Sequence, residues 1–359
     1  MKLGILTFHG AHNYGAVLQC YALQEVLTKM GHDVYVIDYR QPYINEVYKI
    51  FSFQILKRKM KNLGAVADYV RYNIFRASAI KKRREHFEEF TSKYLNLTLP
   101  CDAESVPVDF DAYIIGSDQV WSQVCTGGDF DDVYFGKFRR NEDSRVIGYA
   151  ISSNPASVSH ITSGKMSGRI GDFASISFRE GHFCGALSQI VGGKAEVCVD
   201  PTLLSDSRLW DAIPDVEKKN PYVLVYEVGR QKDRQGLLRH KAERVAQQIG
   251  NNCKVLDVSG MNYSVEEFIS FIRNADCVIT SSFHGTVFSI LFGRMFYCIK
   301  SGMPSDIRFV ELLDSLGLEM RCVADDVDLQ IAPVDYEMVY ERLEDYRRGS
   351  LEFLKTSLK

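Results

Sequence analysis

The segment DCVITSSFHGTVFSILF, from Asp276 to Phe292, constrains the fold of this chain more than any other segment. Its first residues, 276–280, predict a buried strand, residues 281–283 a tight turn, and the apolar run after Gly285 a helix. His284 is therefore expected at the N-terminus of a helix that follows the carboxyl end of a strand. Free backbone N–H groups and the positive end of the helix dipole would face a ligand there. The pattern predicts an anion site, and phosphate is its natural ligand.

Strand and helix patterns alternate in this way along most of the chain. The expected strands cover residues 3–8, 34–38, 112–115, 145–151, 175–178, 195–199, 222–226, 253–258, 276–280 and 295–299. The DPTLL segment at 200–204 interrupts the alternation, and a second cycle begins near Pro221. We therefore expect an α/β protein with two doubly wound Rossmann-like domains facing each other across a cleft, an N-terminal domain over 1–204 and a C-terminal domain over 205–359.

Residues 43–99 are helical in pattern and too long for a simple crossover, so they are expected to form a helical insert in the first domain. Between Lys57 and Arg84 the insert carries ten Lys or Arg residues against one acid, Asp68, with apolar residues interleaved. Two interpretations stay open. The insert is either a solvated helical hairpin packed on the first domain, or a basic amphipathic surface that rests on anionic lipid.

Composition excludes several classes of function. A formal net charge of −3 argues against a general nucleic-acid-binding protein. The nine cysteines occur singly, without a C-x-x-C pair, which fits a reducing cytoplasm better than a disulfide framework. We find no signal-peptide pattern and no apolar stretch long enough to span a membrane, so we expect a cytoplasmic protein, at most peripheral to the inner face of the cell membrane. The eight histidines are dispersed and no H-E-x-x-H motif occurs, so no metal site is expected.

The first candidate loop, FHGAHNYGA at 8–16, joins the first strand to the first helix. It lacks both G-x-G-x-x-G and the Walker phosphate motif, which argues against a dinucleotide or nucleoside triphosphate at this loop. His12, Asn13 and Tyr14 are candidates for ligand contact, because loops in this position line the ligand crevice in doubly wound folds. Asn13 could equally serve only the geometry of the turn.

Two further loops follow strands of the first domain. In GSDQVW, at 116–121, Asp118 either caps a following helix or offers a carboxylate that bonds sugar hydroxyls or accepts a proton, with Trp121 as a stacking surface. In SFRE, at 177–180, Arg179 either forms a surface pair with Glu180 or captures a carboxylate or phosphate.

The SSFHG turn itself has a structural and a catalytic interpretation. A lone histidine in apolar sequence is commonly a hydrogen-bonded structural residue, but a bound dianion beside His284 would favour its protonated form and make it a general acid. Lys300, after the next strand, and Arg308, at the next helix, could join Arg179 around a small doubly anionic ligand. Backbone and hydroxyl donors in the turn could also contact it: Ser282, Gly285 and Thr286.

Five blocks in the chain, taken in order, resemble the polysaccharide pyruvyl transferase family. They are ILTFHGAHNYGAVLQCYALQ, IIGSDQVW, ISFRE, VDPTLL and VITSSFHGTVFSILFGRMF, and together they cover about the whole chain except the basic insert. The resemblance implies a fold like that of the two-domain GT-B glycosyltransferases. It also implies transfer of pyruvate from phosphoenolpyruvate onto two hydroxyls of a sugar, which leaves a cyclic ketal and inorganic phosphate. The resemblance further implies that His284 acts in catalysis and that Arg179 and Arg308 grip phosphoenolpyruvate, a role that Lys300 could share.

With this resemblance, His284 is the expected acid, and Asp118 or a histidine of the first loop is the expected base. The second domain is expected to bind phosphoenolpyruvate, as co-substrate and without a further cofactor. The first is expected to bind the acceptor sugar through His12, Asn13, Tyr14 and Trp121. The acceptor would be a hexose in a cell-surface polysaccharide or in its lipid-linked precursor. Two alternatives stay open: a glycosyltransferase that uses a nucleotide sugar, and a non-catalytic glycan-binding protein.

Overall fold

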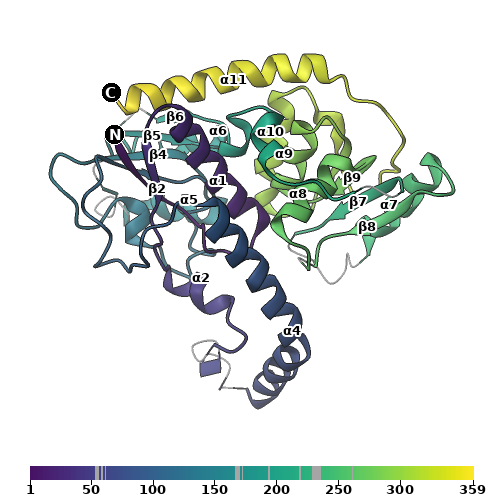
Figure 1. The fold of residues 1–359 in the computed structure, drawn as a ribbon, viewed down its shortest axis with the longest axis horizontal. Helices are drawn as coiled ribbons and strands as arrows, with labels where there is room; N and C mark the ends of the chain where they lie inside the picture. The colour runs from purple at the N-terminus through teal and green to yellow at the C-terminus, as the bar shows by residue number, and fades with distance from the viewer. Residues whose placement is uncertain are drawn as a thin grey trace. The chain divides into compact units, whose positions relative to one another are not determined.

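The computed structural model of the chain describes residues 1–52, 56–57, 60, 62–165, 170–171, 173–192, 195–217, 220–228, 236–260 and 262–359. These residues form two compact units, Met1–Val197 with Ser357–Lys359, and Cys198–Thr356 (Figure 1). Each unit is built around one parallel sheet with helices between its strands. The predicted fold class, α/β with two doubly wound Rossmann-like units and a helical insert in the first, is confirmed.

The sheet of the first unit has the strand order β2-β1-β3-β4-β5-β6. Its strands are β1 (Lys2–Leu6), β2 (Asp33–Val36), β3 (Ala112–Ile115), β4 (Arg145–Ile151), β5 (Ser175–Phe178) and β6 (Ala195–Val197). Its helices include α1 (Tyr14–Lys29), α2 (Pro42–Val47), α4 (Leu63–Tyr94), η1 (Asp132–Phe135), α5 (Pro155–His160), η2 (Ile161–Lys165) and α6 (Gly181–Leu187). The strand order changes direction between β1 and β3, and doubly wound folds place their ligand crevice at such a point, beyond the carboxyl ends of the strands.

Local interactions set both ends of helix α1. The Asn13 side chain accepts hydrogen bonds from the backbone N–H groups of Gly15 and Ala16, which caps the first turn. After the helix, Gly31 takes a φ of 91°, a left-handed conformation that stops the helix at little steric cost. Both ends of the helix are therefore set by local sequence.

The sheet of the second unit has the strand order β11-β10-β9-β7-β8. Its strands are β7 (Tyr222–Tyr226), β8 (Lys254–Asp257), β9 (Cys277–Thr280), β10 (Met295–Ile299) and β11 (Cys322–Val323). Its helices include η3 (Pro201–Leu203), η4 (Ser207–Ala212), α7 (Leu237–Ile249), α8 (Val265–Asn274), α9 (Phe283–Leu291), η6 (Pro304–Asp306), α10 (Ile307–Ser315), η7 (Glu319–Arg321) and α11 (Tyr336–Ser357). This order changes direction between β7 and β9, so the second unit also has a crevice position at its strand ends.

Helical periodicity explains how α7 packs on this sheet. Leu238, Ala242 and Val245 recur on one face of the helix and are buried against Val223 and Ile279 of the strands. Helix α8 begins with a capping box, in which the side chains of Ser264 and Glu267 each bond the other's backbone N–H.

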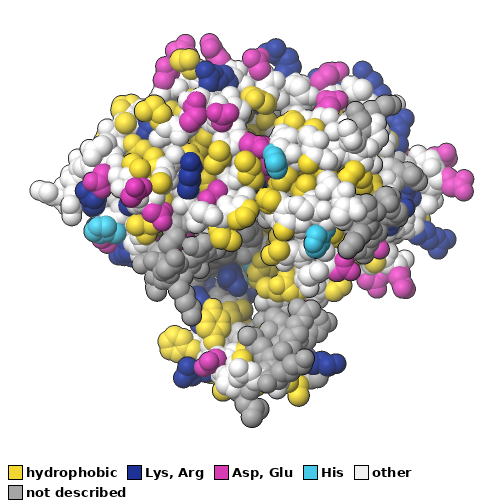
Figure 2. Space-filling view, turned by 180° about the vertical axis from the view of Figure 1, so that it is seen from behind, with side chains coloured by type: hydrophobic (Ala, Val, Ile, Leu, Met, Phe, Trp, Pro, Cys, Tyr) yellow, Lys and Arg dark blue, Asp and Glu magenta, His cyan; other side chains and the backbone are white. Residues whose placement is uncertain are grey.

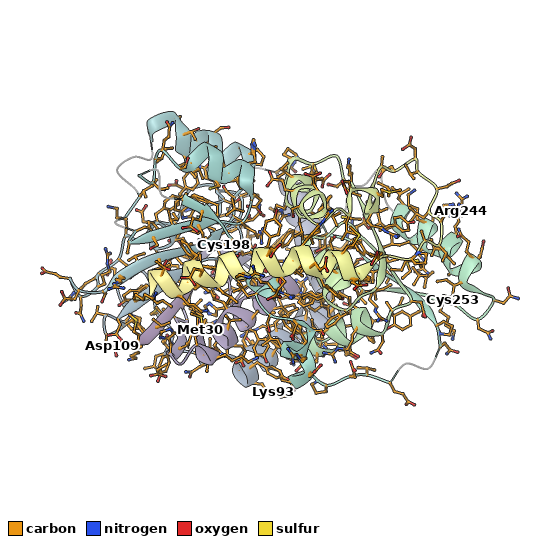
Figure 3. All side chains as sticks on the ribbon, turned by 90° about the horizontal axis from the view of Figure 1, so that it is seen from above. Met30, Lys93, Asp109, Cys198, Arg244 and Cys253 are labelled. Atoms are coloured by element: carbon orange, nitrogen blue, oxygen red, sulfur yellow. The ribbon has the colours of Figure 1, made fainter. Side chains whose placement is uncertain are left out.

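The second unit begins at Cys198, whereas the sequence pattern predicts the end of the first domain at Leu204. Hydrogen bonds to α11 hold this segment in the second unit: Val199 N donates to Ser350 Oγ at 3.0 Å, and Arg347 Nε donates to the carbonyl oxygen of Leu203 at 2.6 Å. Figure 3 accordingly shows Cys198 beside α11. The DPTLL segment therefore belongs to the same unit as His284.

The insert consists of α2 and α4 in the described part of the chain, and the basic residues Arg58, Lys59 and Lys61 lie outside that part. The second half of α4 is anchored in the first unit, where Phe87 and Phe90 are buried. The first half differs, since Tyr72, Ile74 and Phe75 are exposed there, and Phe75 is 89% exposed. Figure 2 shows hydrophobic and basic side chains next to each other on the part of the first unit that carries α4.

Candidate functional site

The turn between β9 and α9 has the strand–turn–helix form that the sequence predicts. Strand β9 is fully buried, and Thr280 Oγ1 bonds the carbonyl oxygen of Tyr226 at 2.6 Å and the backbone N–H of Ser282 at 3.0 Å. Ser282 is the N-cap of α9, because its hydroxyl accepts from Gly285 N at 3.3 Å. These bonds hold His284 in the first turn of the helix, beyond the carboxyl end of β9.

His284 lies against a buried carboxylate that the sequence did not indicate. The residue is 7% exposed, and its Nε2 atom lies 3.6 Å from Asp200 Oδ2, too far for a hydrogen bond and close enough for an ion pair. The other oxygen, Asp200 Oδ1, accepts from the backbone N–H and the hydroxyl of Thr202 and so caps η3. One oxygen of Asp200 thus supports the local fold while the other faces the imidazole ring.

The other predicted donors of this turn are engaged within the fold. The Thr286 hydroxyl is fully buried and donates to the Ser282 carbonyl oxygen at 3.0 Å. A Cβ atom on Gly285 would overlap the Thr280 hydroxyl and crowd the Tyr226 ring at 3.1 Å, so glycine is needed here for close packing of α9 on the strands. Contact of these residues with a ligand stays a prediction.

Two of the predicted cations belong to the same unit as His284. Lys300 follows β10, and β10 pairs with β9 in parallel, so Lys300 and His284 both lie beyond the same edge of the sheet. Lys300 is exposed. Arg308 lies in the first turn of α10, half-buried, with Nε donating to the Ser305 carbonyl oxygen at 3.1 Å. The second unit thus contains two of the predicted cations and the N-terminus of α9.

The third predicted cation, Arg179, belongs to the first unit and is not part of a surface pair. Its side chain is 3% exposed, and its Nε and Nη2 atoms donate to Glu180 Oε1 and Ser152 Oγ, each at 2.9 Å. The surface interpretation is therefore wrong, because the chain buries both charges beyond β5. Ser152 also donates its backbone N–H to the Asp118 carbonyl oxygen, which links Arg179 to the GSDQVW loop.

Asp118 does not cap a helix, because residues 117–121 form turns. Its φ of 69° places a non-glycine residue in the left-handed region, a strained conformation of the kind found at functional sites. Its carboxylate is half-buried and accepts from the backbone N–H of Gln119 at 2.8 Å. The carboxylate interpretation of Asp118 remains, and the capping one is wrong.

The aromatic residues predicted to contact the acceptor lie in the core of the first unit. Trp121 has no exposed surface; its ring stacks on Phe135 at 4.5 Å between centroids, and its Nε1 donates to the Tyr134 carbonyl oxygen at 2.7 Å. Tyr14 is also fully buried and stacks on Phe87. Neither ring faces solvent in this structure, and Asn13 serves as the α1 cap described above.

The first loop contains two histidines with different surroundings. His9 Nε2 bonds Asp38 Oδ1 at 2.9 Å, and its Nδ1 lies 3.2 Å from the Thr7 carbonyl oxygen. Both ring nitrogens are therefore hydrogen-bonded within the fold. Burial disfavours the charged form of Asp38, but His9 and Arg40 outweigh burial and hold the pKa of this carboxyl below its usual value. The His9–Asp38 pair, which the sequence did not indicate, is a structural pair within the fold.

His12 keeps a ring nitrogen that the fold does not use. Its ring is 8% exposed and stacks on Tyr48 and Phe87, with centroids 4.3 and 5.5 Å apart, and its buried Nδ1 atom has no hydrogen-bond partner. Burial, with the charges of Arg83 and Arg84, lowers the pKa of His12 to about 4. The ring is therefore neutral at physiological pH and can exchange hydrogen bonds with a neutral ligand.

Two classes of feature are not found among the residues that the structure describes. In those ranges, His, Cys, Asp and Glu side chains do not gather in groups of three that could hold a metal ion. Over the same ranges, every helix is too short or too polar to cross a membrane.

A family model described as polysaccharide pyruvyl transferase matches residues 13–302. The chain belongs to the polysaccharide pyruvyl transferase family. Membership makes it a transferase that acts on polysaccharide. The family match contains His284, Asp200 and Lys300 of the second unit and ends before Arg308. Among curated proteins, none matches this pyruvyl transferase significantly in sequence.

Several solved structures resemble this pyruvyl transferase weakly in fold. The SsfS6 glycosyltransferase of Streptomyces sp. SF2575 is 12% identical, with 99% of this chain and 96% of that chain covered and a TM-score of 0.39. UGT89C1 of Arabidopsis thaliana is 10% identical, with coverage of 99% and 93% and a TM-score of 0.42. The UDP-GlcNAc 2-epimerase of Neisseria meningitidis, bound to UDP-GlcNAc, is 10% identical, with coverage of 99% and 100% and a TM-score of 0.43. Similarities this weak do not bear on function.

Proposed function

We propose that this pyruvyl transferase moves pyruvate from phosphoenolpyruvate onto two hydroxyls of one sugar unit, giving a cyclic ketal and inorganic phosphate. The observation that carries the proposal is the placement of His284, at the N-terminus of α9 and 3.6 Å from the buried carboxylate of Asp200. A histidine held against a carboxylate is suited to carry a proton, because the negative charge stabilises the imidazolium form.

The second unit offers what phosphoenolpyruvate requires. This molecule carries a carboxylate and a phosphate, so its site needs fixed positive charge and hydrogen-bond donors. The N-terminus of α9 provides backbone donors and the positive end of a helix dipole. Lys300 lies beyond the same sheet edge and Arg308 opens the next helix. We propose that these groups hold the phosphate and the carboxylate.

The proposed reaction has two stages. His284 protonates the methylene carbon of phosphoenolpyruvate, which makes the adjacent carbon electron-poor, and the first sugar hydroxyl attacks that carbon and loses its proton to a base. The bond to phosphate then breaks, and the second hydroxyl closes the ketal and gives up its proton, so that one phosphate is released for each ketal formed.

We propose Asp118 as the base for the hydroxyl. His12 suits this role less, because a pKa of about 4 makes it a weak base at neutral pH. We propose that Asp200 acts through His284, which it faces at 3.6 Å.

Phosphate release tests the central assignment. The His284→Ala variant should lose at least a hundredfold in phosphate released from phosphoenolpyruvate and acceptor, since general acid catalysis contributes about 10²–10⁴-fold. His240→Ala, which removes an exposed histidine of α7 in the same unit, is the matched control and should retain full activity. Undiminished release by His284→Ala would show that another group supplies the proton. Saturable binding of a UDP-sugar with indifference to phosphoenolpyruvate would instead favour a nucleotide-sugar glycosyltransferase.

We further propose that the acceptor is presented as a lipid-linked precursor at the inner face of the cell membrane. The support is the first half of α4, where exposed Tyr72, Ile74 and Phe75 lie beside Arg71 and Arg76. Aromatic and basic side chains together suit the boundary between lipid headgroups and acyl chains.

A further inference from the structure

A cavity of about 350 Å³ lies within the first unit, between the first loop and the insert. Its walls come from the loop at 9–12, the segment at 38–40 after β2, residues 44–49 of α2 and the turn after it, and residues 84–92 of α4. The volume lies within the range of about 300–1,000 Å³ that small-molecule sites occupy. Two of its walls therefore belong to the helical insert, the segment that interrupts the regular alternation of strands and helices.

One buried polar atom in this wall is without a partner. His12 lines the cavity, more than nine-tenths of its surface is buried, and its Nδ1 atom makes no hydrogen bond. A buried polar atom without a partner costs about 1–3 kcal/mol, so its presence calls for an explanation such as a ligand. The stacking of the ring on Tyr48 and Phe87 holds this atom in place.

The charges around the cavity are balanced in pairs. Arg40 bonds Asp38 at 2.6 Å, and Arg84 bonds Glu88 at 2.7 Å. Lys49, which follows α2, pairs with Glu46 of that helix. Among the described residues that line the cavity, these three are all the Lys and Arg side chains. The cavity thus offers many hydrogen-bond donors and acceptors without an excess of positive charge, which suits a neutral polyhydroxyl ligand better than a phosphate.

The proposed base borders the same surroundings. Burial raises the pKa of the Tyr48 hydroxyl to about 12; Arg83 opposes this rise, and the carboxylate of Asp118 lies close enough to add to it. Tyr48 lines the cavity, so the GSDQVW loop and the cavity are neighbours within the first unit.

We propose that this cavity is a binding subsite for one neutral sugar unit of the acceptor, and that the insert exists in part to form it. The identification of the sugar as the acceptor rests on the proposed function, whereas sugar binding itself does not depend on phosphoenolpyruvate. His12 Nδ1 exchanges a hydrogen bond with one sugar hydroxyl, and Asn45, Glu88 and Thr91 offer partners for others.

The test measures sugar binding without phosphoenolpyruvate. Saturation-transfer NMR of the full chain with glucose, galactose, mannose, N-acetylglucosamine and glucuronic acid, and separately with inorganic phosphate, identifies what the cavity accepts. At least one neutral sugar should bind, and the His12→Phe variant, which keeps an aromatic ring but removes Nδ1, should weaken binding at least tenfold. Asn45→Ala, an exposed position on α2 that poses no risk to folding, should weaken it several-fold.

Asn251→Ala, an exposed asparagine of the second unit, is the matched control and should bind sugar as the native chain does. The proposal is overturned if no neutral sugar binds, if both cavity variants bind as the native chain does, or if phosphate is the ligand whose binding depends on His12. Phosphoenolpyruvate binding by the same variants should stay unchanged. If the chain binds no phosphoenolpyruvate at all, the proposed function fails while the sugar subsite can still stand.

Discussion

Replacing Asp200 by Asn isolates the electrostatic role of the carboxylate that faces His284. The amide oxygen of Asn can still accept the two hydrogen bonds from Thr202 that cap η3, so the local fold is kept. What is lost is the negative charge 3.6 Å from His284 Nε2. At an effective dielectric constant of 20, two unit charges at this distance attract by about 5 kcal/mol.

Only part of this attraction should appear in the rate, because both groups remain partly compensated by their surroundings. A loss of about 1.4–4 kcal/mol in transition-state stabilisation corresponds to a decrease of about ten- to a thousandfold in kcat.

The assay is phosphate release from phosphoenolpyruvate and acceptor. Thermal unfolding of the same variant should be close to native, whereas Asp200→Ala, which also removes the cap, should lose about 1 kcal/mol of stability. If Asp200→Asn matched the native rate, Asp200 would serve η3 alone and the role proposed for it would be refuted.

Three other expectations concern stability and surface binding. Gly285→Ala should lower the free energy of unfolding in urea by about 1–3 kcal/mol, because its methyl group would overlap a strand hydroxyl, whereas Gly349→Ala in the open middle of α11 should be neutral or stabilising. A harmless Gly285→Ala would contradict the close packing. The folded state disfavours protonation of His12, so the free energy of unfolding should fall by up to about 3 kcal/mol as the pH falls from about 6.5 to about 4. His12→Phe should flatten that dependence on pH. An NMR titration that places the pKa of His12 in the folded chain near 6.5 would contradict this expectation. Phe75→Glu should reduce cosedimentation with anionic vesicles at low salt, whereas Met320→Glu, at an equally exposed position of the second unit, should not. If the native chain does not cosediment with such vesicles, the membrane proposal is refuted.

Local sequence was sufficient for most of the secondary structure. Strands β3, β4 and β5 of the first sheet and β7 and β10 of the second have the predicted limits, since short apolar runs between turn residues leave few alternatives. The cap of α1 by Asn13 and the turn that presents His284 also follow from neighbouring residues. Hydrogen bonds between residues two or three apart determine such features, so they can be predicted from the sequence.

The same reading failed where the partner lies far along the chain or where burial decides. The surface interpretation of the Arg179–Glu180 pair was wrong because both side chains are buried beyond the end of β5. The helix expected after Asp118 is absent because this segment bonds to Ser152 beyond the neighbouring strand. The exposed stacking role of Trp121 found no support, since the ring fills the space beside Phe135. An aromatic residue after a strand suits a core as well as a binding surface.

The sequence by itself determined that two cycles of strands and helices form, and that a histidine follows a buried strand in the second cycle. Only the tertiary structure decided which charges meet that histidine and which atoms line the cavity beside His12. The physical reason is that periodicity and capping act over a few residues, whereas the meeting of Asp200 with His284 requires η3 to pack against α9 within the second unit. Packing of this kind depends on the shapes of both surfaces together, which no single segment encodes.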